Sequence, residues 1–429
     1  MTRSLIVSII VILIASSVGA GTVTLEQALE RALRANPSIT RAQADIDSAQ
    51  AQRRLARSAI LPRLDLDVSA TQNDREVAFD LGGTNVTLQP RQDWSAKVTL
   101  RQPLYAGGRE LKAIRQTGAT IDAAKAAAKS AEEAILFRTA SDYLSLIEAD
   151  ALIDVERQNA GLASTRREHA MRMLEAGELT RVDVLRAEAA QKAVERQLAA
   201  AEQQRKEAES QLRIDLALDE EIIAVPPALA LPPVPGIEEL AAASLVSHPD
   251  LKRAAATLDI ARLETRKQRG GYLPTVTLNA TLTRQRSPFP TDQARSVAVS
   301  LHVPIFDSGE IASRIAVAGE REKQAAASAC ELRQAIREEI VRAVAGLDTA
   351  RKSFDLAQQQ LAAAEGQHRQ IWALYRSQEA TSLDIDTAEG ALAEARRVVV
   401  FGSLQTKLAE LRVWFAAGSL KLTLLTKEH

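Results

Sequence analysis

Four short segments of the chain alternate between apolar and polar residues. They span residues of about 63–72, 93–102, 275–284 and 296–304, and in each the apolar side chains fall on alternate positions. A period of two is typical of a β-strand with one apolar face. Each segment is also close to the roughly 9–11 residues that a tilted strand needs to cross a bilayer. The pattern therefore predicts four strands that are compatible with a membrane.

Two much longer segments carry a helical pattern instead. Residues of about 107–176 and 309–377 contain no proline, and scattered apolar residues lie among Ala, Glu, Lys and Arg. This texture is typical of helices that pack side by side as in a coiled coil. Each helix would be about 100 Å long at 1.5 Å per residue. A turn and a returning helix follow each of them, at about 180–218 and 381–417.

The chain is an internal duplication. Pro37 and Pro62 return 212 positions later, whereas Pro103 returns 201 positions later as Pro304, so the first half has eleven extra residues between Pro62 and Pro103. A duplication of this length makes each half one structural unit, here a short helix, a helix, two strands, a very long helix and a returning helix. The predicted organisation is a signal peptide at 1–20, a first repeat at 21–218, a proline-rich connector at 219–236, a second repeat at 237–417 and a short, mobile tail at 418–429.

The N-terminus resembles a secretory signal. Arg3 precedes an apolar run from Leu5 to Ala15, and small residues follow up to Ala20. This order of a charged region, an apolar region and a small-residue cleavage site predicts a mature chain that begins at Gly21. An uncleaved anchor helix is the alternative, but the apolar run is short for a membrane span.

Composition argues against an ordinary globular enzyme. Aromatic residues make up only 3% of the chain, and alanine supplies much of its apolar content, which suits thin, closely packed helices. The single cysteine excludes a disulfide within the chain, and 54 basic against 55 acidic residues leave no basic field for a nucleic acid. The five histidines show no metal-ligand spacing, and no catalytic motif is recognisable, so we expect no catalytic residues, no cofactor and no metal.

The four strands have two possible settings. A small soluble sheet would need an apolar cover, which no neighbouring helical pattern offers, so an outer-membrane barrel is favoured. An open sheet edge cannot face lipid, and barrels begin at about eight strands, so several chains must share one ring. Two copies give eight strands and three give twelve, and composition does not choose between them. Aromatic residues at the strand ends are candidates for the membrane-interface girdles: Trp94, Tyr105, Tyr272 and Phe306.

The chain resembles the TolC family of outer-membrane efflux and export channels. The resemblance rests on the duplication, on the Leu-Pro pair that precedes the first strand of each half, on the prolines that end the second strands (Pro103 and Pro304) and on the two helical turns. The resemblance implies a mainly α fold with a small β part. In it a long α-helical coiled-coil barrel continues a transmembrane β-barrel to which each subunit of a homotrimer gives four strands. It implies a passive exit duct in the outer membrane of a Gram-negative-type cell, with a long periplasmic extension that works with a periplasmic adaptor and an inner-membrane transporter. Outer-membrane lipid would surround the barrel. A periplasmic coiled-coil adaptor or spacer is the alternative function.

The two turns between the long and returning helices are the candidate gate. Thr180 with Asp183, and Thr381 with Asp384, have the spacing of a helix cap with an acid three residues on. Capping alone accounts for this pattern, because every helix start needs partners for its free N–H groups. If several copies converge at the tip, the same acids would also form rings that favour cations. Both interpretations can hold together.

The family's tyrosine and arginine that hold the aperture shut are only partly matched. Tyr375 occupies the tyrosine position, but Ala380 stands at the arginine position and Gln378 at the usual glycine. The familiar latch is therefore altered in this chain. We hypothesise from proximity in the sequence that Arg181 or Arg376 substitutes for the missing arginine.

Overall fold

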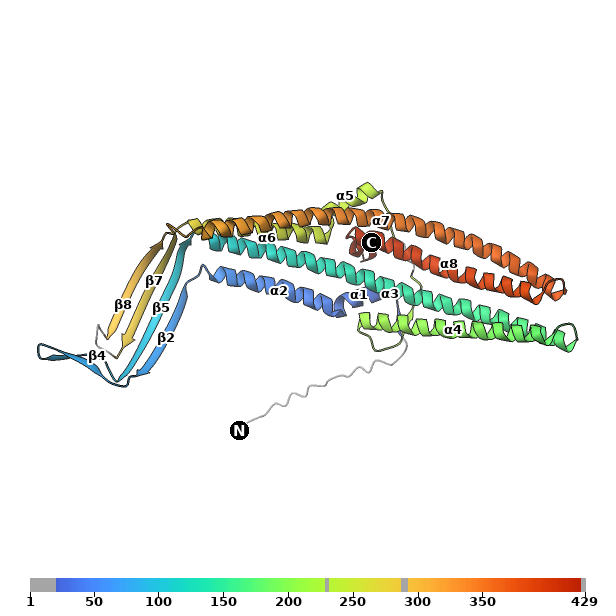
Figure 1. The fold of residues 1–429 in the computed structure, drawn as a ribbon, viewed down its shortest axis with the longest axis horizontal. Coiled ribbons are helices and arrows are strands. Elements are labelled where there is room, and N and C mark those ends of the chain that lie inside the picture. The colour runs from blue at the N-terminus through green and yellow to red at the C-terminus, as the bar shows by residue number, and fades with distance from the viewer. Residues whose placement is uncertain (1–20, 228–230, 287–291, 426–429) are drawn as a thin grey trace, which may run out of the picture.

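The computed structural model describes residues 21–227, 231–286 and 292–425, and the predicted signal peptide lies outside these ranges. The molecule is long and thin, with a sheet at one end, helices along its length and two helical turns at the other end (Figure 1). The helices are α1 (Leu25–Ala35), α2 (Pro37–Ser58), α3 (Arg109–Glu175), α4 (Arg181–Leu216), α5 (Ile237–Ser247), α6 (Pro249–Arg269), η1 (Gly270–Tyr272), α7 (Glu310–Arg376), α8 (Ser382–Ala416) and α9 (Leu420–Leu425). The strands are β1 (Gly21–Val23), β2 (Arg63–Gln72), β3 (Val77–Leu81), β4 (Thr84–Gln89), β5 (Gln92–Ala106), β6 (Ile222–Ala224), β7 (Thr275–Gln285) and β8 (Gln293–His302).

The duplication produces two matched helical hairpins. Helices α3 and α7 are both 67 residues long, and each follows a glycine in the left-handed conformation, Gly108 or Gly309. Each long helix packs against its own returning helix, α4 or α8, and α3 also packs against α8, so the two hairpins are joined (Figure 1). Equal lengths bring the two turns to the same end of the molecule.

The main sheet is antiparallel in the order β2-β5-β7-β8. In this register Leu66 pairs with Val98, Val98 with Leu282, and Ala280 with Val297, so the apolar residues of all four strands share one face. The opposite face is polar, and hydroxyl groups bond across it, with Ser69 and Ser95 at 2.9 Å. In this chain β2 and β8 are the two edges of the sheet.

Strands β3 and β4 form a hairpin that the sequence pattern did not predict. They pair with each other around Gly82 and Gly83, both of which have positive φ, and lie between β2 and β5. The eleven extra residues of the first half fall in this region. The hairpin extends beyond the end of the main sheet that is remote from the helices (Figure 1).

The core lies midway along the helices, where both repeats meet. Tyr143 is fully buried there, and its hydroxyl donates to the carbonyl oxygen of Val23 at 2.8 Å or of Val225 at 2.6 Å. It thereby ties α3 to the parallel pair formed by β1 and β6. The connector predicted at 219–236 therefore contains a strand, β6, in addition to its prolines.

The tail predicted at 418–429 contains a short helix, and its residues 426–429 lie outside the described ranges. Residues 420–425 form α9, and Leu420 is fully buried in the central core. The carboxylate of Glu133 accepts the backbone N–H of Lys421 at 3.2 Å, which satisfies a free donor at the start of this short helix. Apolar burial and this cap hold the segment. Among the described residues, no helix is both long enough and apolar enough to cross a membrane.

Candidate functional site at the helical tips

The two turns at the tip lie side by side and contact each other. Gly177 has φ +77° in the first turn, and Gln378 adopts φ +65° at the corresponding position of the second. The side-chain amide of Gln378 donates to Glu178 at 2.5 Å. Gln378 is less favourable than glycine in the left-handed conformation, but its side chain makes a contact that glycine could not make.

Both candidate acids close the capping boxes that their spacing predicts. The Asp183 carboxylate accepts the backbone N–H of Thr180 at 3.1 Å, and the Asp384 carboxylate accepts that of Thr381 at 2.8 Å. Each also accepts the threonine hydroxyl, which is the largest cause that lowers the pKa of either aspartate. Both acids are therefore ionised at neutral pH and held at the tip.

Tyr375 lies inside the tip and is 5% exposed. Its ring is tilted against His169 of α3 with centroids 5.4 Å apart, and against Trp372 at 6.0 Å. Burial raises the pKa of the tyrosine; the charge of Arg166 opposes this rise, and the nearby carboxylates, Asp183 among them, add to it. Tyr375 therefore packs the second hairpin onto the first as a neutral aromatic group.

A buried arginine that sequence reasoning missed joins the hairpins near the tip. The side chain of Arg166, on α3, is 2% exposed and forms ion pairs with Asp386 and, at 2.9 Å, with Glu389 of α8. Burial raises the pKa of Glu389, and the arginine opposes this rise. No local sequence signal marks Arg166, because its partners lie more than 200 positions away and only the rotation of α3 against α8 brings them together. Arg181 and Arg376, the two hypothesised substitutes, are exposed.

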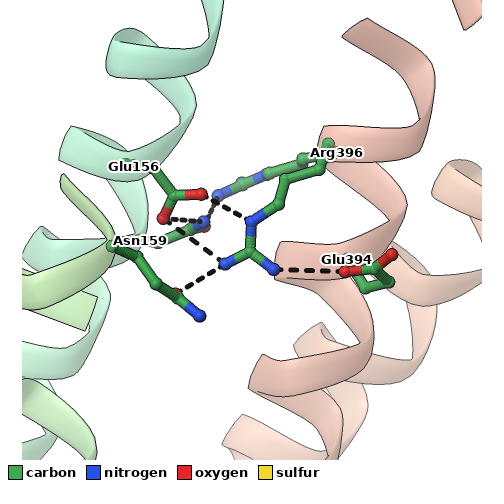
Figure 2. A network of polar contacts seen from close by, with 6 residues as sticks. Glu156, Asn159, Glu394 and Arg396 are labelled. Carbon is green, nitrogen blue, oxygen red and sulfur yellow. Dashed lines mark hydrogen bonds and ion pairs between the residues drawn. The ribbon is translucent and has the colours of Figure 1, made fainter. Parts of the chain in front are cut away.

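A second polar cluster joins the same helices farther from the tip (Figure 2). Arg397 of α8 pairs with the buried Glu156 of α3 at 2.5 Å and donates to Gln197 of α4 at 2.7 Å. Its neighbour Arg396 donates to Asn159 of α3 at 3.2 Å. Three helices from both repeats are therefore fixed to one another at this level.

The side chains at the tip contribute charge and packing contacts. Within the described ranges, no group of three or more His, Cys, Asp or Glu side chains has the arrangement of a metal site. The arrangement holds two fixed anions at the end of the molecule, with a buried aromatic group and buried ion pairs behind them. Such an arrangement can control how closely two hairpins approach.

Comparison with known proteins agrees with this architecture. Residues 28–216 and 240–419 match the family model described as outer membrane efflux protein. Outer membrane efflux protein BepC from Brucella suis biovar 1 (strain 1330) is 22% identical over 400 residues, which cover 92% of this chain and 85% of BepC. The crystal structure of outer membrane protein VceC from Vibrio cholerae has a TM-score of 0.79 at 20% identity and covers 92% of this chain and 96% of VceC. That of a membrane protein from Pseudomonas aeruginosa has a TM-score of 0.81 at 20% identity, covering 92% and 90%.

Proposed function

The chain belongs to the outer membrane efflux protein family, and from this premise we propose that three copies close one barrel and that the paired helical tips form its periplasmic gate. The protein is a TolC-type channel of the outer membrane and serves as the exit duct of an efflux system, with its helices extending into the periplasm. The fold class predicted from the sequence, mainly α with a small β part, is confirmed.

The open four-stranded sheet carries the proposal of a shared barrel. One face of the sheet is apolar, and among the described residues no further strand pairs with the outer side of β2 or β8. Such edges cannot face hydrocarbon, because each unsatisfied group there costs several kcal/mol. In a ring, β8 of one copy would pair with β2 of the next. A periplasmic spacer is not favoured, because it would have no use for this sheet.

The proposed trimer predicts the mass of the particle. Two copies would supply eight strands and three would supply twelve, and the proposal takes three, as the resemblance to TolC-type channels implies. After membrane fractionation and extraction in mild detergent, we expect the protein in the outer membrane fraction. Native mass spectrometry should then find three chains per particle. A folded, water-soluble single chain would contradict the shared barrel, and a dimer would contradict only the copy number.

We propose the gate from the contacts at the tip. Tyr375 and Arg166 hold the second hairpin against the first. In the proposed trimer the acids at the turns would face the mouth of the tunnel. The candidate gate residues are Asp183, Asp384, Thr180, Thr381, Tyr375 and Arg181, and we add Arg166 because of its ion pairs across the hairpins. In this arrangement a change in how α3 packs on α8 changes the width of the tip.

The acids should also set the ion preference of the mouth. In a trimer Asp183 and Asp384 would each occur three times, and a ring of carboxylates favours cations and binds divalent ions. We expect Asp183→Asn with Asp384→Asn to reduce cation selectivity and divalent block in single-channel recordings. Asn retains an oxygen that can accept the cap bond, so helix capping is largely kept. The control is Glu379→Gln, which removes one exposed acid of the same turn outside the capping boxes. Unchanged selectivity and block in the double variant would contradict the rings.

The aromatic residues at the two ends of the strands and the partner proteins complete the proposal. Trp94, Tyr105, Tyr272 and Phe306 are all at least 40% exposed, as expected of girdle residues that contact lipid headgroups. As the outer-membrane part of an efflux system, the channel would receive its substrates from an inner-membrane transporter through a periplasmic adaptor, and the tips are the surface nearest to those partners.

A further inference from the structure

The apolar face of the main sheet ends in arginines. Along β7 the residues of this face are Val276, Leu278, Ala280 and Leu282, and the next one is Arg284. On β8 the row from Leu301 through Val299 and Val297 ends at Arg295, which lies opposite Leu282. Both arginines lie at the end of the sheet that is remote from the helices, and both are exposed.

These two arginines are neighbours in space. Arg284 pairs with Gln293 in the ladder, and Arg295 is two positions farther along the same strand, so the two are diagonal neighbours on one face. Diagonal neighbours in an antiparallel sheet are about 7–8 Å apart, within joint reach of long side chains. Arg286 follows just beyond the strand, where its backbone N–H donates to the carbonyl oxygen of Trp94 at 3.0 Å.

Among the described residues of the four strands, no acidic side chain on this face balances the positive charge. Along β2, β5, β7 and β8, as far as the structure describes them, the residues on the apolar face include no Asp or Glu. The next copy's β2, which would lie beside β8 in the proposed ring, adds only Leu, Val, Ala and Gln side chains to this face. Like charges that are close on one sheet face repel each other. An anion from outside the protein would remove this repulsion.

The depth of the arginines fits a lipid headgroup. Arg284 is the tenth residue of an 11-residue strand, and Arg295 is the third residue of the paired strand that returns from the same end. Because about 9–11 tilted residues cross the bilayer, both lie at the membrane surface on the side away from the periplasmic helices. A hollow of about 440 Å³ begins beside them, lined mainly by apolar residues such as Val98, Leu282 and Val297, with Arg295 at one end.

We propose that Arg284 and Arg295, assisted by Arg286, bind the phosphate of an acylated glycolipid in the outer leaflet, and that one of its acyl chains lies along this hollow. The inference rests on the proposed function, because the apolar face must contact lipid. Guanidinium groups form paired hydrogen bonds with phosphate, and two adjacent arginines supply more donors than one. The phosphorylated glycolipid of the outer leaflet, of the lipid A type, offers both the anion and the acyl chains on this side of the membrane. A trimer would carry three such sites.

The test is lipid binding to the intact trimer. Native mass spectrometry of purified, delipidated trimer would be titrated with three probes: bisphosphorylated lipid A, the same lipid without phosphates, and phosphatidylglycerol. We expect preferential binding of phosphorylated lipid A that weakens as salt rises. The Arg284→Gln/Arg295→Gln variant should bind it about tenfold more weakly or worse, since hydrogen bonds to charged groups are among the strong ones.

A matched control lies on the other face of the same sheet. Arg63 and Arg101 are paired in the ladder and face the polar side, so Arg63→Gln/Arg101→Gln removes the same charge without touching the proposed site. Its affinity for lipid A should equal that of the unmodified protein. Equal binding of the dephosphorylated lipid, or unchanged affinity in the Arg284/Arg295 variant, would overturn the site, and equal binding of phosphatidylglycerol would overturn its assignment to a glycolipid. A folded, water-soluble single chain in place of the trimer would count against the shared barrel instead.

Discussion

Replacing Arg166 with alanine should loosen the periplasmic tip and raise the conductance of the channel. The variant leaves Asp386 and Glu389 of α8 without their cation, in an interface where the arginine is 2% exposed and Glu389 is 14% exposed. Removing one partner of a buried ion pair costs about 3–5 kcal/mol, because the remaining charge stays buried and unpaired. The molecule can reduce this cost if α8 moves away from α3, because the two carboxylates then reach water. In planar bilayers we expect a larger and less stable single-channel conductance.

The control for this variant lies on the same helix. Arg157 is 62% exposed, and its ion pair within the described residues is with the exposed Asp154 of α3. Arg157→Ala should therefore change stability by less than about 1 kcal/mol and leave conductance unchanged. A second control removes every charge of the cluster. Arg166→Met with Asp386→Ala and Glu389→Leu leaves no unpaired ion, and apolar replacements of whole buried clusters are often neutral or stabilising. This triple variant should restore the closed tip. If Arg166→Ala conducts like the unmodified channel, Arg166 does not hold the tip.

Features that depend on residues close together in the sequence, such as strand faces and helix caps, were predicted from the sequence. Alternation along residues 275–284 specifies which face of the strand is apolar, because adjacent side chains in a strand point to opposite faces. The spacing of Thr381 and Asp384 likewise specifies a cap, and the structure has both of its hydrogen bonds. Pro103 and Asp183 both recur 201 positions later, so the segment between them has the same length in each half, and the structure has two long helices of equal length.

Other features depended on contacts that the sequence does not reveal. Arg166 looks like any charged residue of a long helix, and its burial follows only from the packing of α3 on α8. The docking of α9 depends on Glu133, which is nearly 300 positions away. The β3–β4 hairpin was predictable in part, since Gly82-Gly83 between short apolar runs is a known turn signal. Its strands were missed because they are short and lie within an insertion that has no counterpart in the second half.

Replacing Gly107 with alanine should have the other large effect, by disrupting the junction between the sheet and the helices. Gly107 has φ +63°, and a Cβ atom there would lie 2.2 Å from the carbonyl oxygen of Gly270. The left-handed backbone alone costs an alanine about 1–2 kcal/mol. The collision adds a cost of about 1–3 kcal/mol typical of overpacking, because the opposing atom belongs to the backbone and cannot rotate away. We expect a clear fall in Tm, followed by circular dichroism in detergent, and a lower yield of assembled channel.

The neighbouring glycine separates the two contributions. Gly108 also has positive φ, +69°, but a Cβ there would meet no atom within 4 Å, so Gly108→Ala carries the backbone cost without the collision. The duplication supplies a natural comparison, because the residue equivalent to Gly107 in the second half is Ser308, with φ +53°. A Cβ is accepted there, so a left-handed conformation does not by itself demand glycine at this junction. Gly107 is required because the backbone of the other repeat passes against it. If Gly107→Ala and Gly108→Ala have the same Tm, the collision with this backbone does not lower the stability.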